Sequence, residues 1–253
     1  CGLRCAWCHN PEGLRSAPDL MWYDNRCIAA LDCMRVCPEE ALALRPGGMV
    51  IDRERCTACG KCVTACPTAA LELIGREWTV EELLAEITRD AVFYETSGGG
   101  VTFSGGEPVL QSGFLAQLLP RCRDAGIHVA LDTCGAIAWP EYERLLPHVD
   151  LVLLDLKIID RERHLAATGV PNDLILANAR RFAERGVPLW IRTPIVPGYT
   201  DDEEYLATIA ALVRELPTVE RWDRLPYNNL GQPKYHRLGL PYALEGIPSF
   251  PPD

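Results

Sequence analysis

The sequence lacks a surplus of basic residues, and it lacks a long hydrophobic run. Its 253 residues include 25 Lys and Arg against 35 Asp and Glu, giving a net charge of −10. Nucleic acids and anionic membranes are bound through basic surfaces, so this balance predicts neither as a partner. The most apolar stretch, VDLVLLDLKII, is interrupted by Asp155 and Lys157 and is too short to span a bilayer. An apolar fraction of 48% predicts a sizeable folded core.

Cysteine is nearly absent from the last three-quarters of the chain. Only Cys122 and Cys134 lie beyond residue 66, and neither has the spacing of a metal ligand. The other cysteines are concentrated in residues 1–66. Such density suits either a disulfide-linked secreted module or a set of metal sites in a reducing cytoplasm. The spacing of the cysteines has to decide between the two.

Residues 26–44 are repeated at residues 55–73, and the spacing of this repeat favours iron–sulfur clusters over disulfides. The second copy reads C-x2-C-x2-C-x3-C-P, the ligand run of bacterial ferredoxins. In two-cluster modules the fourth cysteine of each run binds the other cluster. One predicted 4Fe–4S site is therefore complete and consists of Cys37, Cys56, Cys59 and Cys62. The other site has only Cys27, Cys33 and Cys66.

The incomplete site results from Ala30, which stands where the second copy has Cys59. Alanine cannot bind iron. The site is therefore predicted to hold either a 3Fe–4S cluster or a 4Fe–4S cluster with a non-cysteine ligand. The neighbouring Asp32 is a candidate for that ligand, and the sequence leaves both alternatives open.

Beyond Trp78 the pattern changes to helices that alternate with short apolar strands. Thr79 and Glu82 form a capping box ahead of a helical stripe. Strands are predicted near 101–103, 128–132, 151–155, 188–193 and 219–226, and further helices near 112–125, 140–147, 160–168, 173–185 and 202–216. Strands that are almost wholly apolar are typical of a parallel sheet covered by helices. The pattern predicts an α/β fold, either a β/α barrel or an open sheet.

Polar motifs follow these strands at the points where the strands end. They are SGGEP at 104–108, DTCG at 132–135, DLK at 155–157, Arg192, and the segment YNNLG that begins at Tyr227. Barrel enzymes place their chemistry at this end of the strands. Each motif has a purely structural explanation, such as a tight turn or a helix cap, but together they predict one shared polar site.

The chain begins with three closely spaced cysteines, Cys1, Cys5 and Cys8. A cubane cluster has four irons, so three thiolates leave one iron without a protein ligand. An open coordination position is what separates catalytic metal sites from structural ones. A substrate with an amino nitrogen and a carboxylate oxygen could bind there.

In combination, six motifs resemble the radical SAM activating enzymes of glycyl radical enzymes, in the branch with a ferredoxin-type insert. The motifs are LRCAWCHNPE, SGGGVTFSGGEPVLQ, LDTCG, DLKIID, IRTPIVPGYTDDE and LGQPKYHRLG. The resemblance covers nearly the whole chain and implies a partial (β/α)6 barrel. Residues 1–25 would form its cluster loop, 26–74 a small ferredoxin-like α+β insert, and 75–253 the remaining barrel. The family's first strand and final helix are expected to lie outside this sequence.

The resemblance also implies the chemistry. Cys1, Cys5 and Cys8 would hold a 4Fe–4S cluster that binds S-adenosylmethionine (SAM). Reductive cleavage of SAM would yield a 5′-deoxyadenosyl radical, which removes hydrogen from a glycine Cα of a partner glycyl radical enzyme.

The same resemblance implies a set of SAM-binding residues. Glu107 would accept a hydrogen bond from the SAM ammonium, and Arg192 would pair with a carboxylate. Asn228 replaces the histidine of the family's PYHxLG motif near the ribose. The full set is Trp7, His9, Gly105, Gly106, Glu107, Asp132, Thr133, Asp155, Leu156, Lys157 and Asn228.

The resemblance further implies electron delivery by a flavodoxin or ferredoxin through the auxiliary clusters, in an anaerobic cytoplasm, to a monomeric enzyme. One alternative is another radical SAM reaction on a small molecule. A second alternative is a ferredoxin-like electron carrier, which would leave the first three cysteines and the SGGEP motif without a role. The sequence does not identify the partner enzyme.

Overall fold

The structure is a computed structural model, and it describes residues 1–250. The chain divides into two compact units. Among the described residues, unit 1 consists of Cys1–Trp7, Trp78–Asn228 and 247–250, and unit 2 consists of Cys8–Glu77 and Asn229–Gly246. Within the described residues, no helix is both long enough and apolar enough to cross a membrane.

Unit 1 is built around a five-stranded sheet in which all neighbouring strands are parallel. Its order follows the chain: β5 (Gly100–Phe103), β6 (His128–Thr133), β7 (Leu151–Asp155), β8 (Leu189–Ile195) and β9 (Val219–Pro226). The predicted parallel sheet and the positions of all five strands are confirmed.

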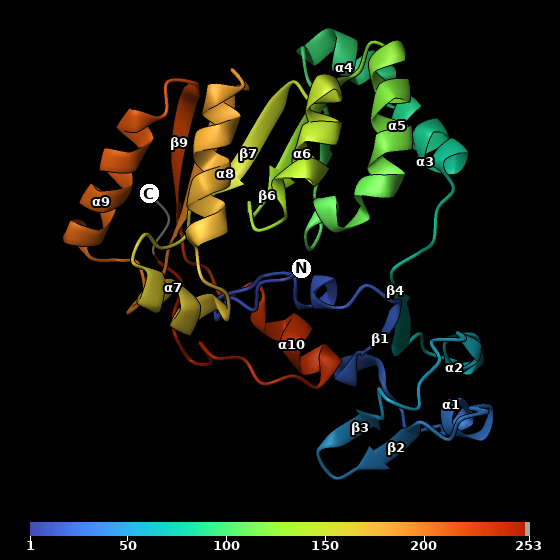
Figure 1. Ribbon diagram of the computed structural model, residues 1–253. Coiled ribbons are helices and arrows are strands. Elements are labelled where there is room, and N and C mark those ends of the chain that lie inside the picture. The colour runs from blue at the N-terminus through green and yellow to red at the C-terminus, as the bar shows by residue number, and fades with distance from the viewer. Residues whose placement is uncertain (251–253) are drawn as a thin grey trace. The chain divides into compact units, whose positions relative to one another are not determined.

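Helices connect successive strands of unit 1 and cover one face of the sheet. Four of them, α5 (Ser112–Asp124), α6 (Trp139–Leu145), α8 (Asp173–Glu184) and α9 (Glu203–Glu215), line up along the same face (Figure 1). The other helices of unit 1 within the described residues are α3 (Val80–Thr88), α4 (Ala91–Ser97) and α7 (Arg161–Thr168), with 3₁₀ turns η3 (Pro108–Gln111) and η4 (Leu146–His148). One-sided coverage follows from right-handed crossovers between sequentially adjacent parallel strands.

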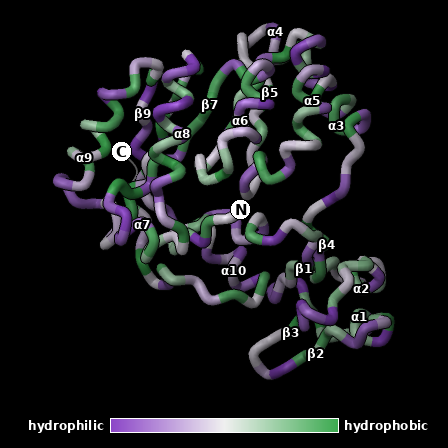
Figure 2. The backbone as a smooth tube through the Cα atoms, viewed as in Figure 1, coloured by the Kyte–Doolittle hydropathy of each residue, from purple (hydrophilic) through white to green (hydrophobic). Residues whose placement is uncertain are grey.

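Local sequence explains these elements. The capping box at the start of α3 forms as predicted, because the Thr79 side chain accepts from the Glu82 backbone and the Glu82 carboxylate accepts from the Thr79 backbone. The central strands bury Leu131, Val152 and Ile191 completely. Figure 2 shows this distribution, with β7 largely hydrophobic and α8 mixed along its length.

Unit 2 contains two small antiparallel pairs. β1 (Asp19–Trp22) pairs with β4 (Leu71–Ile74), and β2 (Leu42–Arg45) pairs with β3 (Gly48–Ile51). Its helices are α1 (Asp32–Arg35), α2 (Lys61–Ala65) and α10 (Gln232–Leu238), with 3₁₀ turns η1 (Pro11–Leu14) and η2 (Asp24–Arg26). The core of this unit includes two of the predicted cluster cysteines, Cys33 and Cys62.

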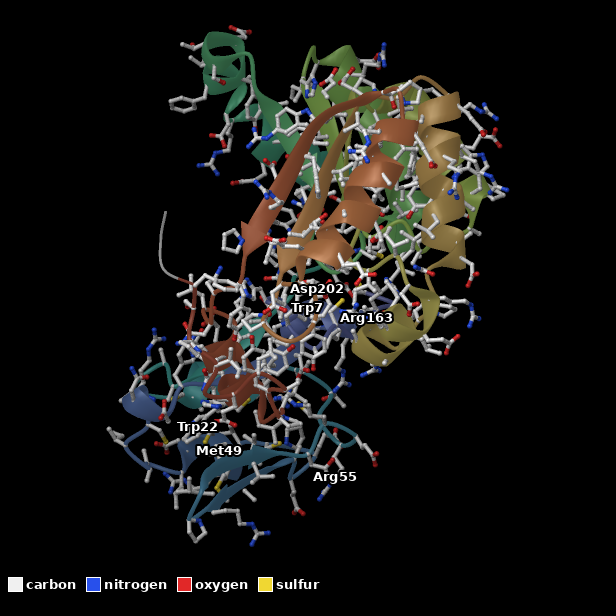
Figure 3. All side chains as sticks on the ribbon, turned by 90° about the vertical axis from the view of Figure 1, so that its left-hand side faces the viewer. Trp7, Trp22, Met49, Arg55, Arg163 and Asp202 are labelled. Atoms are coloured by element: carbon white, nitrogen blue, oxygen red, sulfur yellow. The ribbon has the colours of Figure 1, made fainter. Side chains whose placement is uncertain are left out.

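The turn between β2 and β3 requires glycine because an aromatic ring fills the space beside it. Gly48 has φ +117°, and a Cβ there would lie 2.6 Å from the Trp22 ring. Met49 and Trp22 both pack on the core of unit 2, where Figure 3 labels them. Trp22 of β1 and Met49 of β3 therefore pack on the same small core as Cys33 and Cys62.

Candidate active site and cluster sites

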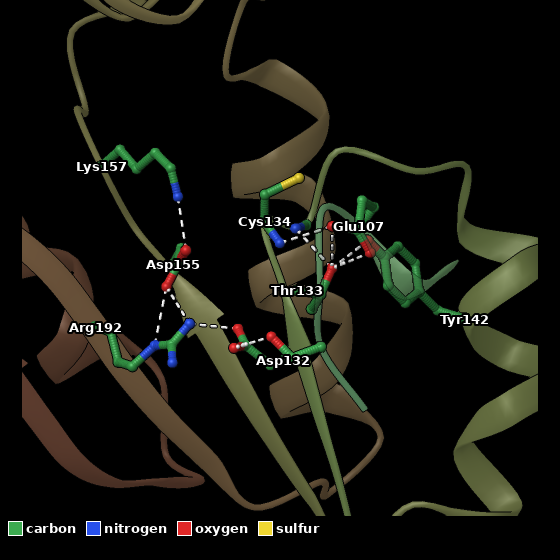
Figure 4. Close-up of polar contacts among 10 residues, drawn as sticks. Glu107, Asp132, Thr133, Cys134, Tyr142, Asp155, Lys157 and Arg192 are labelled. Carbon is green, nitrogen blue, oxygen red and sulfur yellow. Dashed lines mark hydrogen bonds and ion pairs between the residues drawn. The ribbon is translucent and has the colours of Figure 1, made fainter. Parts of the chain in front are cut away.

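Unit 1 gathers charged side chains where its parallel strands end. The Arg192 guanidinium, on β8, donates from Nε and Nη2 to Asp155 Oδ1 at 3.0 and 2.8 Å, and it also donates to Asp132 at the end of β6. The Lys157 ammonium donates to Asp155 Oδ2 at 2.7 Å, and the Ser104 hydroxyl to Asp132 Oδ2 at 2.7 Å. Figure 4 shows this network, in which two carboxylates balance two cations.

Opposite charges keep Asp155 and Lys157 ionised although both groups are largely withdrawn from solvent. Burial alone would raise the pKa of Asp155, but the charges of Lys157 and Arg192 outweigh burial and lower it. Burial alone would lower the pKa of Lys157, but Asp155 and, to a smaller extent, Cys5 raise it. The site is therefore an arrangement of fixed charges in which positive and negative groups balance. Cys5 lies near the Lys157 ammonium.

Glu107 joins the ends of β5 and β6 from inside unit 1. Its buried carboxylate accepts from Thr133 Oγ1 at 2.9 Å, from the Cys134 backbone at 2.9 Å and from the Val109 backbone at 3.2 Å. The Tyr142 hydroxyl lies 2.9 Å from Thr133 Oγ1. The Thr133 hydroxyl has one proton, which it donates to the Glu107 carboxylate. In the contact between Thr133 and Tyr142, the Tyr142 hydroxyl is therefore the donor (Figure 4).

The Tyr142 hydroxyl is a positioning group that the sequence did not reveal. Burial raises the pKa of Tyr142, so its hydroxyl stays protonated and continues to donate. Tyr142 lies inside α6 in the segment WPEYERL, which contains no recognisable motif. Only the packing of α6 against the sheet brings it to the DTCG loop.

We expect Tyr142→Phe to destabilise unit 1 by about 1–3 kcal/mol, because buried Thr133 and Glu107 lose a hydrogen-bond donor from their chain. Tyr205→Phe is the matched control. The buried Tyr205 hydroxyl has no hydrogen-bond partner among residues 1–250. Denaturant unfolding of both variants measures the difference, and equal losses would contradict the proposed donor chain.

Gly105 leaves the SGGEP loop open on one side. Its φ is +125°, a conformation that side chains rarely adopt, and a Cβ there would meet nothing within 4 Å. Glycine at this position allows a ligand to approach the backbone closely. Leu156, in the DLK motif, is buried and donates its backbone N–H to the Arg192 carbonyl at 3.0 Å. Asn228 follows Tyr227, whose backbone N–H binds the Ile195 carbonyl at the end of β8.

The first seven residues are fastened to unit 1. The Arg4 and Ala6 backbones donate to the Thr168 and Ala167 carbonyls at 2.7 and 3.0 Å, at the end of α7. Leu3 is buried, so Cys1 and Cys5 flank an anchored segment.

Trp7 continues this anchor. It is buried and meets Tyr199 edge-on, with ring centroids 5.4 Å apart. Near it in Figure 3, Arg163 and Asp202 form an ion pair of 3.1 Å.

Cys8 and His9 belong to unit 2, where they contact the segment Asn229–Gly246, which we call the brace. A Cβ on Gly231 would lie 3.1 Å from His9 Cα and 3.3 Å from the Cys8 carbonyl oxygen. The Lys234 ammonium, on α10, donates to Asn10 Oδ1 at 2.9 Å and to Glu12 Oε1 at 2.6 Å. Residues more than 220 positions apart in the chain therefore fix the exit of the cysteine loop.

The remaining repeat cysteines line two separate hollows of unit 2. One hollow is bordered by Cys37, Cys56, Cys59 and Cys62, and the other by Cys27, Cys33 and Cys66. The chain thus brings together the two groups that the cross-ligation rule predicts. The twelve cysteines all lie within the described residues, and none forms a disulfide there.

The donor chemistry of the hollows suits iron–sulfur clusters. Thiols dominate the polar lining of each hollow. Across residues 1–250, no three His, Cys, Asp or Glu side chains are grouped tightly enough to hold a single metal ion. A cluster spreads its thiolates around several irons, and each hollow is bordered by at least three cysteines.

Comparisons with known proteins show the family to which this chain belongs. The family model of the radical SAM superfamily matches residues 53–209, and that of the 4Fe–4S dicluster domain matches residues 26–70. The trans-4-hydroxy-L-proline dehydratase activating enzyme of Clostridioides difficile is 40% identical over 98% of this chain and 82% of its own. The isethionate sulfite-lyase activating enzyme of Nitratidesulfovibrio vulgaris is 40% identical over 94% of this chain and 79% of its own.

The chain belongs to the radical SAM superfamily, among the glycyl-radical-enzyme activases. A solved structure supports the fold of this activase. Streptococcus suis SuiB bound to S-adenosylmethionine aligns with a TM-score of 0.52 and 18% identity, over 66% of this chain and 38% of SuiB. The activase cleaves SAM reductively at an iron–sulfur cluster and removes a hydrogen atom from a glycine Cα of a partner glycyl radical enzyme.

Proposed function

We propose that Cys1, Cys5 and Cys8 hold the activase's SAM-binding 4Fe–4S cluster and leave one iron open for SAM. The positions of the other nine cysteines support this assignment, because all of them lie elsewhere in the fold. Seven line the two hollows of unit 2, and Cys122 and Cys134 are buried among the residues of unit 1. Three thiols within eight residues remain, which is the ligand set of an open site.

The methionyl end of SAM, which is zwitterionic, is proposed to bind at the charged network of unit 1. Its carboxylate would be oriented by Lys157 and Arg192 and its ammonium by Asp132 and Asp155. A balanced network suits such a ligand, because each charge of the ligand meets an opposite one and the net charge of the site does not change. The backbone at Gly105 would provide the close approach.

Glu107 is proposed to contribute mainly by holding this site in shape. Its carboxylate accepts from Thr133, Cys134 and Val109, so it fixes the SGGEP loop against the DTCG loop. Gly106 and Thr133, on the same two loops, would then face SAM through backbone groups. The proposed hydrogen bond from the SAM ammonium to Glu107 would add to these contacts.

The adenosyl end is proposed to lie by Trp7, His9, Leu156 and Asn228. Trp7 offers an aromatic ring already held by Tyr199, and Leu156 offers an apolar surface at the end of β7. Asn228 can both donate and accept hydrogen bonds, as a ribose requires. Asn228 follows the end of β9 and so lies at the edge of the sheet where the charged network is found.

Residues 26–74 are proposed to form a two-cluster insert between the cluster loop at 1–25 and the barrel remainder at 75–253. A complete 4Fe–4S site would use Cys37, Cys56, Cys59 and Cys62, and a second cluster would use Cys27, Cys33 and Cys66. A flavodoxin or ferredoxin is the proposed electron donor, because a chain of clusters can relay single electrons. The enzyme is proposed to work as a monomer in an anaerobic cytoplasm, where exposed clusters survive.

Activation of candidate partners tests the proposed function. The reduced, reconstituted activase would be incubated with SAM and, separately, with a hydroxyproline dehydratase, an isethionate lyase and a choline lyase. A glycyl radical EPR signal on one partner, with 5′-deoxyadenosine formed in equal amount, is the expected result. SAM cleavage without any partner radical would favour a small-molecule substrate, and no cleavage would favour an electron carrier.

We expect Gly231→Ala to disturb the first cluster, because its Cβ would press on the Cys8 and His9 backbones. The EPR line shape of the reduced cluster should change, and its iron occupancy should fall. Gly113→Ala is the control, since a Cβ there meets nothing within 4 Å and alanine favours the helix. An unchanged spectrum in Gly231→Ala would show that the brace does not position Cys8.

A further inference from the structure

The incomplete cluster loop of unit 2 has the same backbone as the complete one. Left-handed residues occur at Ala29, Leu31 and Glu40 in the first copy. In the second copy they occur at the corresponding positions, Ala58, Gly60 and Ala69. Figure 1 shows the helices that follow, α1 and α2, next to each other.

The first loop adopts this backbone with more conformational strain than the second, because it places leucine where the second has glycine. Leu31 has φ +62°, where the second copy places Gly60 at φ +74°. A left-handed residue other than glycine is strained, because its Cβ lies close to the following carbonyl oxygen. Such conformations persist where the surrounding structure and function require them. The presence of Ala30 where the second copy has Cys59 is therefore accompanied by the same backbone conformation.

The hollow at the incomplete site is similar in size to the complete one. Both hollows are partly open, and they contain about 320 and 310 Å³ of atom-free space when the adjoining solvent is included. The first copy of the repeat therefore leaves room beside its three cysteines, as the second copy does beside its four.

One difference in the lining points to the missing ligand. Asp32 borders the incomplete hollow, whereas its counterpart Lys61 does not border the complete one. Thr68, another oxygen-bearing residue of the incomplete hollow, has a counterpart in Glu39, which borders the complete hollow. Thr68 thus belongs to the shared scaffold, and Asp32 is the oxygen donor that accompanies the change to Ala30.

Asp32 is also available to bind iron. In this structure its carboxylate pairs with Arg35, and the two side chains are 40% and 66% exposed. An ion pair this exposed to solvent contributes little to stability, so Asp32 can exchange Arg35 for iron with little loss. Carboxylate oxygen is an established ligand for iron in proteins. Asp32 also precedes Cys33, one of the three cysteines of the hollow.

We propose that the Cys27, Cys33 and Cys66 hollow holds a 4Fe–4S cluster whose fourth iron is bound by the Asp32 carboxylate. The inference rests on the proposed auxiliary cluster at this hollow. In the binding step an oxygen of Asp32 donates an electron pair to iron and the Arg35 guanidinium is released to solvent. No proton or electron is gained or lost.

Iron content and EPR spectra of the anaerobically reconstituted full chain test this ligand. Asp32→Ala is expected to lose one iron per chain and to show the signal of an oxidised three-iron cluster. Lys61→Ala, at the matching position of the second copy, should show neither change. Adding Ala30→Cys to Asp32→Ala should restore the iron and remove the signal, which also shows that the loop still folds.

Two results would overturn the proposal. Wild-type iron content without a three-iron signal in Asp32→Ala would assign the fourth position to a solvent-derived ligand. A three-iron signal already present in the wild-type protein would assign a 3Fe–4S cluster. A separate variant, Cys27→Ser, examines the underlying site: full iron content there would show that this hollow holds no cluster at all.

Discussion

Replacing Cys5 with serine is expected to abolish SAM cleavage, while the two auxiliary clusters remain. Three thiolates are the minimum that holds a cubane and leaves one iron open, so losing one removes the cluster or its open position. Formation of 5′-deoxyadenosine by the reduced protein should fall to the level measured without enzyme. The iron lost should correspond to one cluster, because the hollows of unit 2 use other cysteines.

Cys122→Ala provides the control for this prediction. Cys122 is fully buried in the core of unit 1 and lies on α5, away from the strand ends. Its replacement should lower the free energy of unfolding slightly and leave both iron content and SAM cleavage unchanged. SAM cleavage by Cys5→Ser at the wild-type rate would show that the first three cysteines are not the catalytic set.

Arg192→Met is expected to be the most destabilising single change at the charged network. Methionine keeps much of the side-chain volume but leaves Asp132 and Asp155 without the cation that both contact. The three side chains are no more than 24% exposed, so the lost compensation should cost about 3 kcal/mol of unfolding free energy. SAM affinity should fall as well, because the site then carries excess negative charge near the proposed carboxylate position.

The exposed pair of Glu86, on α3, and Arg89, the residue that follows this helix, gives the comparison. Its side chains are 72% and 52% exposed, although the nitrogen–oxygen distance is only 2.8 Å. Arg89→Met should therefore change the unfolding free energy by less than about 0.5 kcal/mol. Denaturant unfolding and SAM titration of both variants would separate burial from mere proximity. Equal losses would contradict the assigned role of the network.

Much of the fold was predictable because burial leaves a strong pattern. Strands such as β7, with the sequence LVLLD, are apolar until the residue at which they reach the polar edge. The helix starts were predictable where a side chain caps the backbone, as Thr79 does. The short helix α4 was not predicted, since its exposed Val92 and Phe93 give no amphipathic stripe.

The site was predictable where ligands are close in sequence and obscure where they are not. Cys5, Cys59 and Asp155 lie in short motifs whose spacing reflects their chemistry. Tyr142 and Lys234 act through contacts that only the folded chain creates, and Lys234 meets Glu12 across 222 positions. The repeat placed Asp32 beside the incomplete site. Only the structure shows that Asp32 borders its hollow, whereas the corresponding Lys61 does not border the other one.

One measurement tests the central claim directly: pulsed EPR of the reduced, full-length activase with SAM labelled at its amino nitrogen and carboxylate oxygen. The account predicts hyperfine coupling from both labels to one cluster, absent in Cys5→Ser and retained in Cys27→Ser. A reduced cluster that shows no coupling to either label, with its unique iron bound by a side chain of this protein, would contradict it.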